Sequence, residues 1–394
     1  MKIAIFSDAF YPVNSGVVSY LTTITKELSL KGHKIYLFVP KFKDNTYKKL
    51  FNKNVQFFTY SGLSHHNYRN FKFTSLLEIK DLKIFKEINP DIIFYLTPLT
   101  LGLKGIILSK IFNKPFIGFF HTRITEKDNL ANMIKISKKI NLEKVAWGYV
   151  KYSYKDCDTV ICASEDIKLD LDKHQINKNI QVINNFVNIK ELDNKKTKIS
   201  IKPNSFVYFG RLSLEKNLFC LINSFKIALN KNKNIHLYLI GDGPIRKDLE
   251  KFVKNNYLDK NVFFLGQIER DNFLKTDLLK KFLAIVTMSN SEVQPMTLIE
   301  AMFKGLPILG PDSDGIRELI KGNGIIVKKD SSEDMAKAIL TILGDIKLQK
   351  KMSLISLERS KNYSSKVLIE KLEKESIKII SNHKKRRKRL FSNL

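Results

Sequence analysis

Short apolar runs alternate with segments of helical periodicity along nearly the whole chain. Such runs are typical of strands buried on both faces, and the amphipathic segments between them are typical of covering helices. In the first half we expect strands at residues 3–6, 34–39, 55–58, 91–95, 116–120, 159–162 and 181–183, and helices at 17–30, 76–87, 99–112 and 142–154. This alternation predicts an α/β fold with a parallel sheet.

A second series of elements follows a polar, lysine-rich stretch at residues 191–204, which we interpret as a domain linker. Here we expect strands at 206–209, 236–240, 262–265, 283–286, 307–309 and 325–327, and helices at 218–230, 245–256, 276–281, 297–303, 316–320 and 333–343. A chain of 394 residues exceeds the usual size of one hydrophobic core. We predict an N-terminal domain at 1–190, a C-terminal domain at 205–360, and a final helix with a basic tail at 361–394 that packs back toward the N-terminal domain.

The composition indicates a globular protein and suggests its compartment. Hydrophobic residues make up 43% of the chain and aromatic residues 11%, which excludes a disordered chain. The chain shows no signal-peptide pattern, and no apolar run approaches the roughly 18 uncharged residues of a membrane-spanning helix. The three cysteines, Cys157, Cys162 and Cys220, complete no zinc site and are typical of buried thiols in a reducing compartment. We therefore expect a cytoplasmic protein.

The formal net charge of +29 indicates attraction to anionic partners such as phospholipid, nucleic acid or acidic polymers. Part of this charge also fits the general enrichment of the chain in Lys, Asn and Ile. The densest cluster is a run of six cations that is typical of segments binding anionic membranes: Lys384, Lys385, Arg386, Arg387, Lys388 and Arg389. A mixed apolar and basic segment at 68–74 favours the same interpretation. The alternative for the basic run is a solvated, frayed chain end.

Loops at the carboxyl ends of predicted strands carry the candidate chemistry, because open parallel sheets bind ligands at that edge. Gly16 lies between the first strand and the first helix, where backbone N–H groups can approach a phosphate. Arg211 and Lys216 precede a later helix and can bind phosphoryl oxygens, the first as a bidentate fork and the second as a mobile point charge. Residues 241–244 form a glycine-containing turn that approaches a ligand or a neighbouring loop. Taken singly, these features also fit ordinary turns and a surface ion pair with Glu215.

Two glutamates, Glu292 and Glu300, flank the start of another predicted helix. The backbone amides of Met296 and Thr297 open that helix and can bind a phosphate. Glu300 can accept hydrogen bonds from ribose hydroxyls. With Glu300 at the ribose, Glu292 would face the transferred sugar. On spacing alone, two exposed glutamates are the ordinary interpretation.

Taken in this order, the motifs resemble the retaining glycosyltransferases of family 4, which have the GT-B fold. The motifs that carry this resemblance are the Gly16 loop, His121-Thr122, residues 184–188, Gly210-Arg211 with Lys216-Asn217, residues 241–244 and residues 292–300. The resemblance implies two doubly wound Rossmann-like domains that face a central cleft, with the nucleotide sugar bound by the C-terminal domain.

The resemblance also implies roles for single residues. Arg211 and Lys216 would bind the donor diphosphate, Glu300 the ribose, and Glu292 the transferred sugar. His121 would lie beside the sugar and the acceptor. The implied catalytic residues are His121, Arg211, Lys216 and Glu292, and the implied donor-binding residues are Gly16, Arg211, Lys216, Glu292, Met296, Thr297 and Glu300.

No cofactor and no essential metal are expected. The pattern Asp312-Ser313-Asp314 is the kind that coordinates manganese in the other main glycosyltransferase fold. In the family that this chain resembles, the same position is an acidic, glycine-containing turn, and cations and helix dipoles stabilise the diphosphate.

We therefore expect an enzyme that transfers a hexose from a nucleoside diphosphate sugar, with UDP favoured over GDP, and retains the anomeric configuration. The basic cluster favours a membrane-lipid acceptor, such as diacylglycerol or another glycolipid precursor, and peripheral association with the inner face of the cell membrane. A polysaccharide or a soluble acceptor remains open. A basic nucleic-acid-binding protein also remains open, although no helix-turn-helix, RNA-recognition or zinc-finger signature accompanies the charge.

Overall fold

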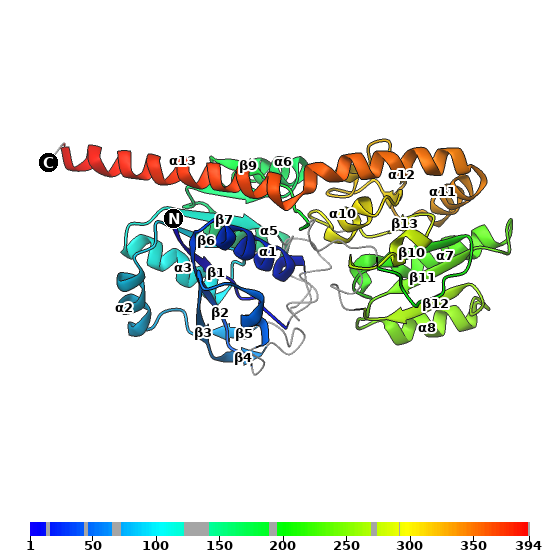
Figure 1. Ribbon diagram of the computed structural model, residues 1–394, viewed down its shortest axis with the longest axis horizontal. Helices are drawn as coiled ribbons and strands as arrows, with labels where there is room; N and C mark the ends of the chain where they lie inside the picture. Colours follow the sequence, from blue (N-terminus) through cyan, green and yellow to red (C-terminus); the bar gives the residue numbers. More distant parts are fainter. Residues whose placement is uncertain are drawn as a thin grey trace. The chain divides into compact units, whose positions relative to one another are not determined.

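The computed structural model describes residues 1–12, 16–42, 46–64, 72–121, 142–188, 195–268, 274–290 and 292–392 (Figure 1). The chain forms two compact units. Unit 1 consists of Met1–Asn185 together with Ser365–Leu394, and unit 2 consists of Phe186–Ser364. Each unit is an α/β domain with its own parallel sheet.

Within the described residues, unit 1 contains a seven-stranded sheet in the order β3-β2-β1-β6-β7-β8-β9. These strands are β1 (Lys2–Phe6), β2 (Lys34–Pro40), β3 (Val55–Tyr60), β6 (Ile92–Tyr95), β7 (Phe116–Phe120), β8 (Thr159–Cys162) and β9 (Ile180–Val182). All of their pairings are parallel, with Ile3 of β1 opposite both Ile35 and Ile92. The order reverses between β1 and β6, and such a reversal opens a crevice for ligands at the carboxyl edge of a sheet.

The helices of unit 1 begin and end largely where the periodicity predicts. They are α1 (Gly16–Leu30), α2 (Ile79–Ile88), α3 (Thr100–Ile111), α5 (Leu142–Tyr154), α6 (Glu165–Lys173) and α13 (Ser365–Ser392), with a 3₁₀ turn at Thr46–Leu50. The strands β4 (Gly62–Ser64) and β5 (Lys72–Thr74) pair antiparallel and form a separate two-stranded sheet. Helix α6 was not predicted, because only Ile167 and Leu171 of this short, charged segment are buried. Its start is fixed by Ser164, whose Oγ accepts a hydrogen bond from the Ile167 N–H at 3.3 Å.

Helix α13 packs on unit 1 although it comes last in the chain. Its inner face buries Leu368, Ile369 and Leu372. On the same side Glu373 accepts a hydrogen bond from Lys31 Nζ at 2.6 Å and contacts His33 Nε2 at 2.7 Å, both just after α1. The basic run that begins at Lys384 continues this helix, so its backbone is not a frayed chain end.

Unit 2 contains, in its described part, a six-stranded parallel sheet in the order β12-β11-β10-β13-β14-β15. The strands are β10 (Ser205–Phe209), β11 (His236–Ile240), β12 (Val262–Gly266), β13 (Ile285–Val286), β14 (Ile308–Pro311) and β15 (Gly324–Val327). The helices are α7 (Leu218–Leu229), α8 (Arg246–Asn255), α10 (Met296–Phe303), α11 (Ser332–Gly344) and α12 (Ile346–Ser360). The order reverses between β10 and β13, as it does between β1 and β6 in unit 1.

Two helices predicted in unit 2 are shorter than expected. The segment at 276–281 forms the 3₁₀ turn Leu278–Lys281, and the segment at 316–320 forms the 3₁₀ turn Arg317–Leu319. Each is too short to complete the hydrogen bonds of an α-helix. Their apolar residues are buried between longer elements, which stabilises a single turn without helical propagation.

The stretch predicted as a linker belongs to unit 2 where it is described. The Lys195 N–H donates to the Lys275 carbonyl at 3.0 Å, and the Thr197 N–H donates to Asp277 Oδ1 at 2.8 Å. Despite its lysine-rich composition, the described part of this stretch is therefore hydrogen-bonded to unit 2 and is not a free linker. The chain instead leaves unit 1 after Asn185 and returns to it after Ser364. None of the helices in the described ranges is long and apolar enough to cross a membrane.

Candidate active site

The candidate site of unit 2 lies where the strand order reverses. Strands β10 and β13 are neighbours, so the loops that follow them meet at the carboxyl edge of the sheet. Lys216 follows β10 and Glu292 follows β13, and the Lys216 Nζ contacts Glu292 Oε1 at 2.6 Å. Their side chains are only 19% and 18% exposed. The fold thus joins two predicted catalytic residues into a largely desolvated ion pair.

The glycines after β10 and β11 allow two backbone segments to touch. The Gly210 N–H donates to the Ile240 carbonyl at 3.0 Å. A Cβ on Gly241 would lie 1.9 Å from the Gly210 carbonyl oxygen, and one on Gly243 would lie 2.2 Å from that of Leu212. The turn at 241–244 therefore supports the loop that carries Arg211, which is exposed at the surface.

A second glycine contact supports the loop that carries Glu292. Gly315 has a positive φ of 72°, and a Cβ there would lie 2.3 Å from the Val293 carbonyl oxygen. The neighbouring acidic residues Asp312 and Asp314 pair with the Arg317 guanidinium at 2.7 and 3.3 Å. This turn therefore backs the Glu292 loop, and its carboxylates neutralise a cation. Across the described ranges, no group of three or more His, Cys, Asp or Glu side chains is placed to hold a metal ion.

Helix α10 places the remaining residues predicted to bind the donor. It begins at Met296 after Pro295, so the amides of Met296 and Thr297 lie in its first turn, where helix N–H groups have no acceptor within the helix. Glu300 lies one turn further and is 1% exposed. The interpretation of Glu300 as an ordinary exposed glutamate is thereby excluded. Burying a carboxylate to this extent costs a large desolvation free energy.

Asp8, the first residue of the predicted Gly16 loop at 8–17, organises the carboxyl edge of the sheet in unit 1. Asp8 follows β1 and is fully buried. Its carboxylate accepts hydrogen bonds from Thr97 Oγ1 at 2.8 Å, Thr100 Oγ1 at 2.9 Å and the Leu101 N–H at 2.7 Å. Burial is the largest influence on its pKa and raises it. Asp8 therefore holds the start of α3 at the β1 and β6 reversal. The sequence signal for it is a carboxylate two residues after an apolar strand.

His121 follows β7 at this edge and is neutral. Its ring stacks on Phe119 with centroids 5.8 Å apart and lies 4.3 Å from the ring of Tyr20. Burial lowers the pKa of His121 to about 3. Helix α1 begins at Gly16 and carries Tyr20, so the predicted Gly16 and His121 belong to contacting elements of unit 1.

Two family descriptions match successive parts of the chain. "Glycosyltransferase Family 4" matches residues 14–191, and "Glycosyl transferases group 1" matches residues 189–356. The chain belongs to the family 4 glycosyltransferases. The prediction of an enzyme of this class is thereby confirmed.

Relatives of known name and structure agree with this assignment. The alpha-monoglucosyldiacylglycerol synthase of Streptococcus pneumoniae is 28% identical over 87% of this chain and 78% of its own length. The protein of the same name from Acholeplasma laidlawii is 22% identical over 98% of this chain and 99% of its own length.

Solved structures confirm the predicted GT-B fold. Sucrose-phosphate synthase from Thermosynechococcus elongatus matches with a TM-score of 0.75 at 16% identity, covering 97% of this chain and 99% of that one. Anabaena HepE in complex with UDP and glucose matches with a TM-score of 0.72 at 19% identity, covering 95% of this chain and 99% of that one.

The basic residues predicted to bind membranes are only partly described in this glycosyltransferase. Lys384, Lys385 and Arg386 are exposed on α13, where Arg386 also contacts Asp158 at 3.1 Å. The side chains of Arg387, Lys388 and Arg389 lie outside the described residues. Of the mixed segment at 68–74, residues 68–71 lie outside them as well, and the remainder forms β5.

Substituting Gly241→Ala should displace the loop of Arg211. The new Cβ would collide with the Gly210 carbonyl, and the φ of 138° at this position disfavours any side chain. We expect a loss of at least about 2 kcal/mol in the free energy of unfolding, together with a loss of sugar transfer. Thermal or denaturant unfolding and an activity assay measure both effects. Gly344→Ala is the matched control, since a Cβ there meets no atom within 4 Å; equal stability of the two variants would contradict the close contact.

Substituting His121→Gln should reduce the acid sensitivity of the fold. The pKa of His121 is about 3 in the folded protein, below the ordinary value of 6.5. As the pH falls below 6.5, the unfolded chain therefore takes up this proton first, which lowers the free energy of unfolding progressively toward pH 3. The substituted protein lacks this contribution, so its stability should decline less between pH 6.5 and 4. Parallel declines in denaturant titrations across this range would show that His121 titrates normally.

Proposed function

We propose that this glycosyltransferase moves a hexose from a nucleoside diphosphate sugar, UDP rather than GDP, to a membrane-lipid hydroxyl with retention at the anomeric carbon. The contact between Lys216 and Glu292 at the β10 and β13 reversal is the observation that carries the donor part of this proposal. The names of two relatives, both alpha-monoglucosyldiacylglycerol synthases, support diacylglycerol or another glycolipid precursor as the acceptor. The HepE complex with UDP and glucose supports UDP in the donor.

The donor diphosphate would be held by two cations and a helix start. Arg211 presents a planar fork for phosphoryl oxygens, and Lys216 presents a point charge. Diphosphate oxygens would compete with Glu292 for the ammonium group of Lys216, which is only 2.6 Å from the carboxylate. The amides of Met296 and Thr297 add positive potential at the start of α10.

Glu292 and Glu300 would position the two sugars of the donor. Once Lys216 engages the diphosphate, the Glu292 carboxylate can accept hydrogen bonds from hydroxyls of the transferred hexose. Glu300 would accept hydrogen bonds from the ribose, and its burial strengthens such bonds because water does not compete. His121 of unit 1 is neutral at physiological pH and would act as a hydrogen-bond partner of a sugar hydroxyl rather than as a cation.

Retention would proceed by front-side attack. The bond between the anomeric carbon and the diphosphate breaks, the acceptor oxygen bonds to that carbon on the same face, and the departing phosphate oxygen takes the hydroxyl proton. Arg211 and Lys216 stabilise the charge that develops on the leaving group. Because these cations and the α10 amides supply the positive charge, we expect transfer to persist in EDTA.

The acceptor part of the proposal rests on charge as well as on the relatives. Lys384, Lys385 and Arg386 form an exposed basic cluster on α13, suited to peripheral association with the anionic inner face of the cell membrane. A polymeric acceptor is the alternative, since a Staphylococcus aureus relative named poly(ribitol-phosphate) alpha-N-acetylglucosaminyltransferase is 25% identical over 54% of this chain and 42% of its own length. The family assignment accounts for the loops at the carboxyl ends of the strands and disfavours a nucleic-acid-binding protein.

A donor screen with and without lipid tests the proposed reaction. UDP- and GDP-hexoses are incubated with the enzyme and with anionic vesicles that contain diacylglycerol, and released nucleotide and labelled glycolipid are measured. We expect one UDP-hexose to turn over and its sugar to appear on the lipid with the donor's anomeric configuration. Turnover that forms no glycolipid would move the acceptor to a polymer or a soluble saccharide.

Substituting Arg211→Ala or Lys216→Ala should lower kcat by about 100-fold or more, since each removes stabilisation of the leaving group. Single-turnover transfer measures the loss, and Lys247→Ala on the outer face of α8 is the control. Lys216→Ala also leaves Glu292 without its ion-pair partner, so the substitution is repeated in a Glu292→Gln background. If Lys216 serves only to pair with Glu292, Lys216→Ala will not lower kcat further in the Glu292→Gln background.

Substituting Glu300→Gln should weaken donor binding while preserving the fold. The amide has the same shape, and losing a charged acceptor for the ribose should raise the donor KM about tenfold or more. Steady-state kinetics and direct UDP titration measure the change, with Glu358→Gln as an exposed control on α12. An unaltered UDP affinity would remove Glu300 from the ribose site.

A further inference from the structure

Helix α13 has an outward face that extends far beyond the terminal basic cluster. More than half of its described residues from Lys366 to Arg386 are exposed, and these positions form one broad stripe along the helix. The cations of this face are Lys366, Lys371, Lys374, Lys378, Lys384, Lys385 and Arg386, and all are exposed. From Val367 to Lys385 the stripe runs about 27 Å along the helix axis.

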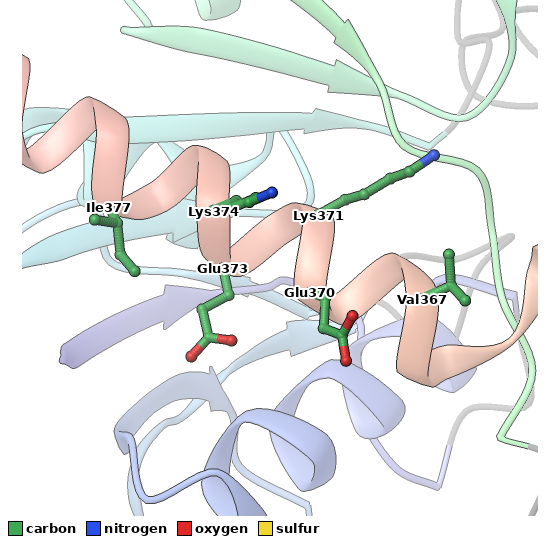
Figure 2. Close-up of a pocket in the computed structure, with 6 residues that line it drawn as sticks. All are labelled: Val367, Glu370, Lys371, Glu373, Lys374 and Ile377. Atoms are coloured by element: carbon green, nitrogen blue, oxygen red, sulfur yellow. The ribbon is translucent and has the colours of Figure 1, made fainter.

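Two exposed apolar residues lie within the same stripe. Val367 is 41% exposed and Ile377 is 54% exposed, ten positions apart. Both line a shallow hollow of about 450 Å³ along the helix, together with Glu370, Lys371, Glu373 and Lys374. In Figure 2, Lys371, Lys374 and Val367 extend to one side of α13, whereas Glu370, Glu373 and Ile377 extend toward the side of α1.

The acidic residues of α13 cancel only part of the charge of this face. Glu373 turns inward and is bound by Lys31 and His33. Glu375 is 15% exposed and pairs with Lys378 at 3.5 Å. Glu370 is the exposed acid among the described side chains of the helix. The outward face therefore remains strongly cationic, with apolar groups interspersed.

We propose that α13 lies lengthwise on an anionic bilayer and binds it through this whole face, rather than through the terminal cluster alone. The proposal deepens the proposed function, since it rests on a membrane-lipid acceptor. The lysines match the negative surface, and Val367 and Ile377 enter the interfacial region. An anionic polymer such as nucleic acid would match the lysines but would leave the two apolar residues without a role.

The inner face of α13 gives this contact a fixed orientation. Leu368, Ile369 and Leu372 are buried against unit 1, and Arg386 contacts Asp158 at 3.1 Å. A helix so held cannot turn its lysines away from the bilayer without unit 1 turning with it. Binding along the stripe therefore orients unit 1, whereas binding by a terminal cluster would only tether it.

Vesicle sedimentation of the full chain tests the proposal without any donor or acceptor, so it fails or succeeds separately from the proposed reaction. The vesicles contain phosphatidylcholine alone or phosphatidylcholine with phosphatidylglycerol. The test variant combines Lys371→Gln, Lys374→Gln and Lys378→Gln and leaves residues 384–389 intact. At about fivefold per lysine, we expect its affinity for anionic vesicles to fall on the order of 100-fold.

A matched control separates this face from bulk charge. Lys247→Gln, Lys251→Gln and Lys254→Gln remove three exposed lysines, likewise spread over seven positions of one helix, from α8, which has no exposed apolar residue. We expect this variant to bind anionic vesicles within about threefold of the parent protein. An equal loss in the two triple variants would overturn the proposal in favour of net charge. Unchanged binding of the α13 variant would overturn it in favour of the terminal cluster.

A second variant distinguishes a bilayer from an anionic polymer. Val367→Ser with Ile377→Ser removes the apolar contacts without altering charge, and should lower vesicle affinity roughly tenfold. Binding of a labelled single-stranded oligonucleotide should not change. If the double variant binds vesicles as the parent does, and the parent prefers the oligonucleotide, the face is a polyanion site and the proposal fails. Far-UV circular dichroism and thermal unfolding confirm that each variant remains folded.

Discussion

The ion pair of Lys216 and Glu292 is the interaction on which the candidate site of unit 2 depends. Each partner is about four-fifths buried, so neither charge would be stable at this depth without the other. The pair can form only because β10 and β13 are neighbours, and that pairing follows from the reversal of strand order. The glycine contacts at Gly241 and Gly315 then fix the two loops from behind. The strand order, the glycine contacts and the ion pair thus all position the same two loops, at the carboxyl edge between β10 and β13.

Unit 1 has the same reversal of strand order as unit 2, but different side chains lie at it. At its own reversal the buried group is Asp8, and hydrogen bonds from Thr97, Thr100 and α3 satisfy its carboxylate. His121 at the same edge is kept neutral by burial. The groups at the described edge of unit 1 are therefore a hydrogen-bonded carboxylate and a neutral imidazole, whereas those of unit 2 are an ion pair and a helix start.

Much of the fold could be predicted from the sequence, because strands buried on both faces appear as continuous apolar runs. The runs at 3–6 and 236–240 match β1 and β11 closely. Helix α6 could not be predicted, because its charged sequence buries only two residues. The composition of residues 191–204 indicates a linker, because composition does not reveal the hydrogen bonds of this stretch to residues 275 and 277.

The residues of the candidate site could be predicted from the sequence, but the contacts between them could not. Lys216 and Glu292 were selected separately, and their pairing across 76 positions depends on strand order, which local periodicity does not specify. Asp8 opens the predicted Gly16 loop, but its hydrogen bonds to residues 97–101 depend on the pairing of β1 with β6, which local periodicity does not specify.

The return of α13 to unit 1 has a consequence for how the chain is made. Residues 186–364 include every element of unit 2, so this domain has its full sequence before unit 1 does. Unit 1 must wait for Leu368, Ile369 and Leu372, which cover it from a helix that follows unit 2 in the chain. During synthesis, the first domain to be translated is therefore the last to be completed. Until α13 docks, the surface it covers is exposed to chaperones and to aggregation.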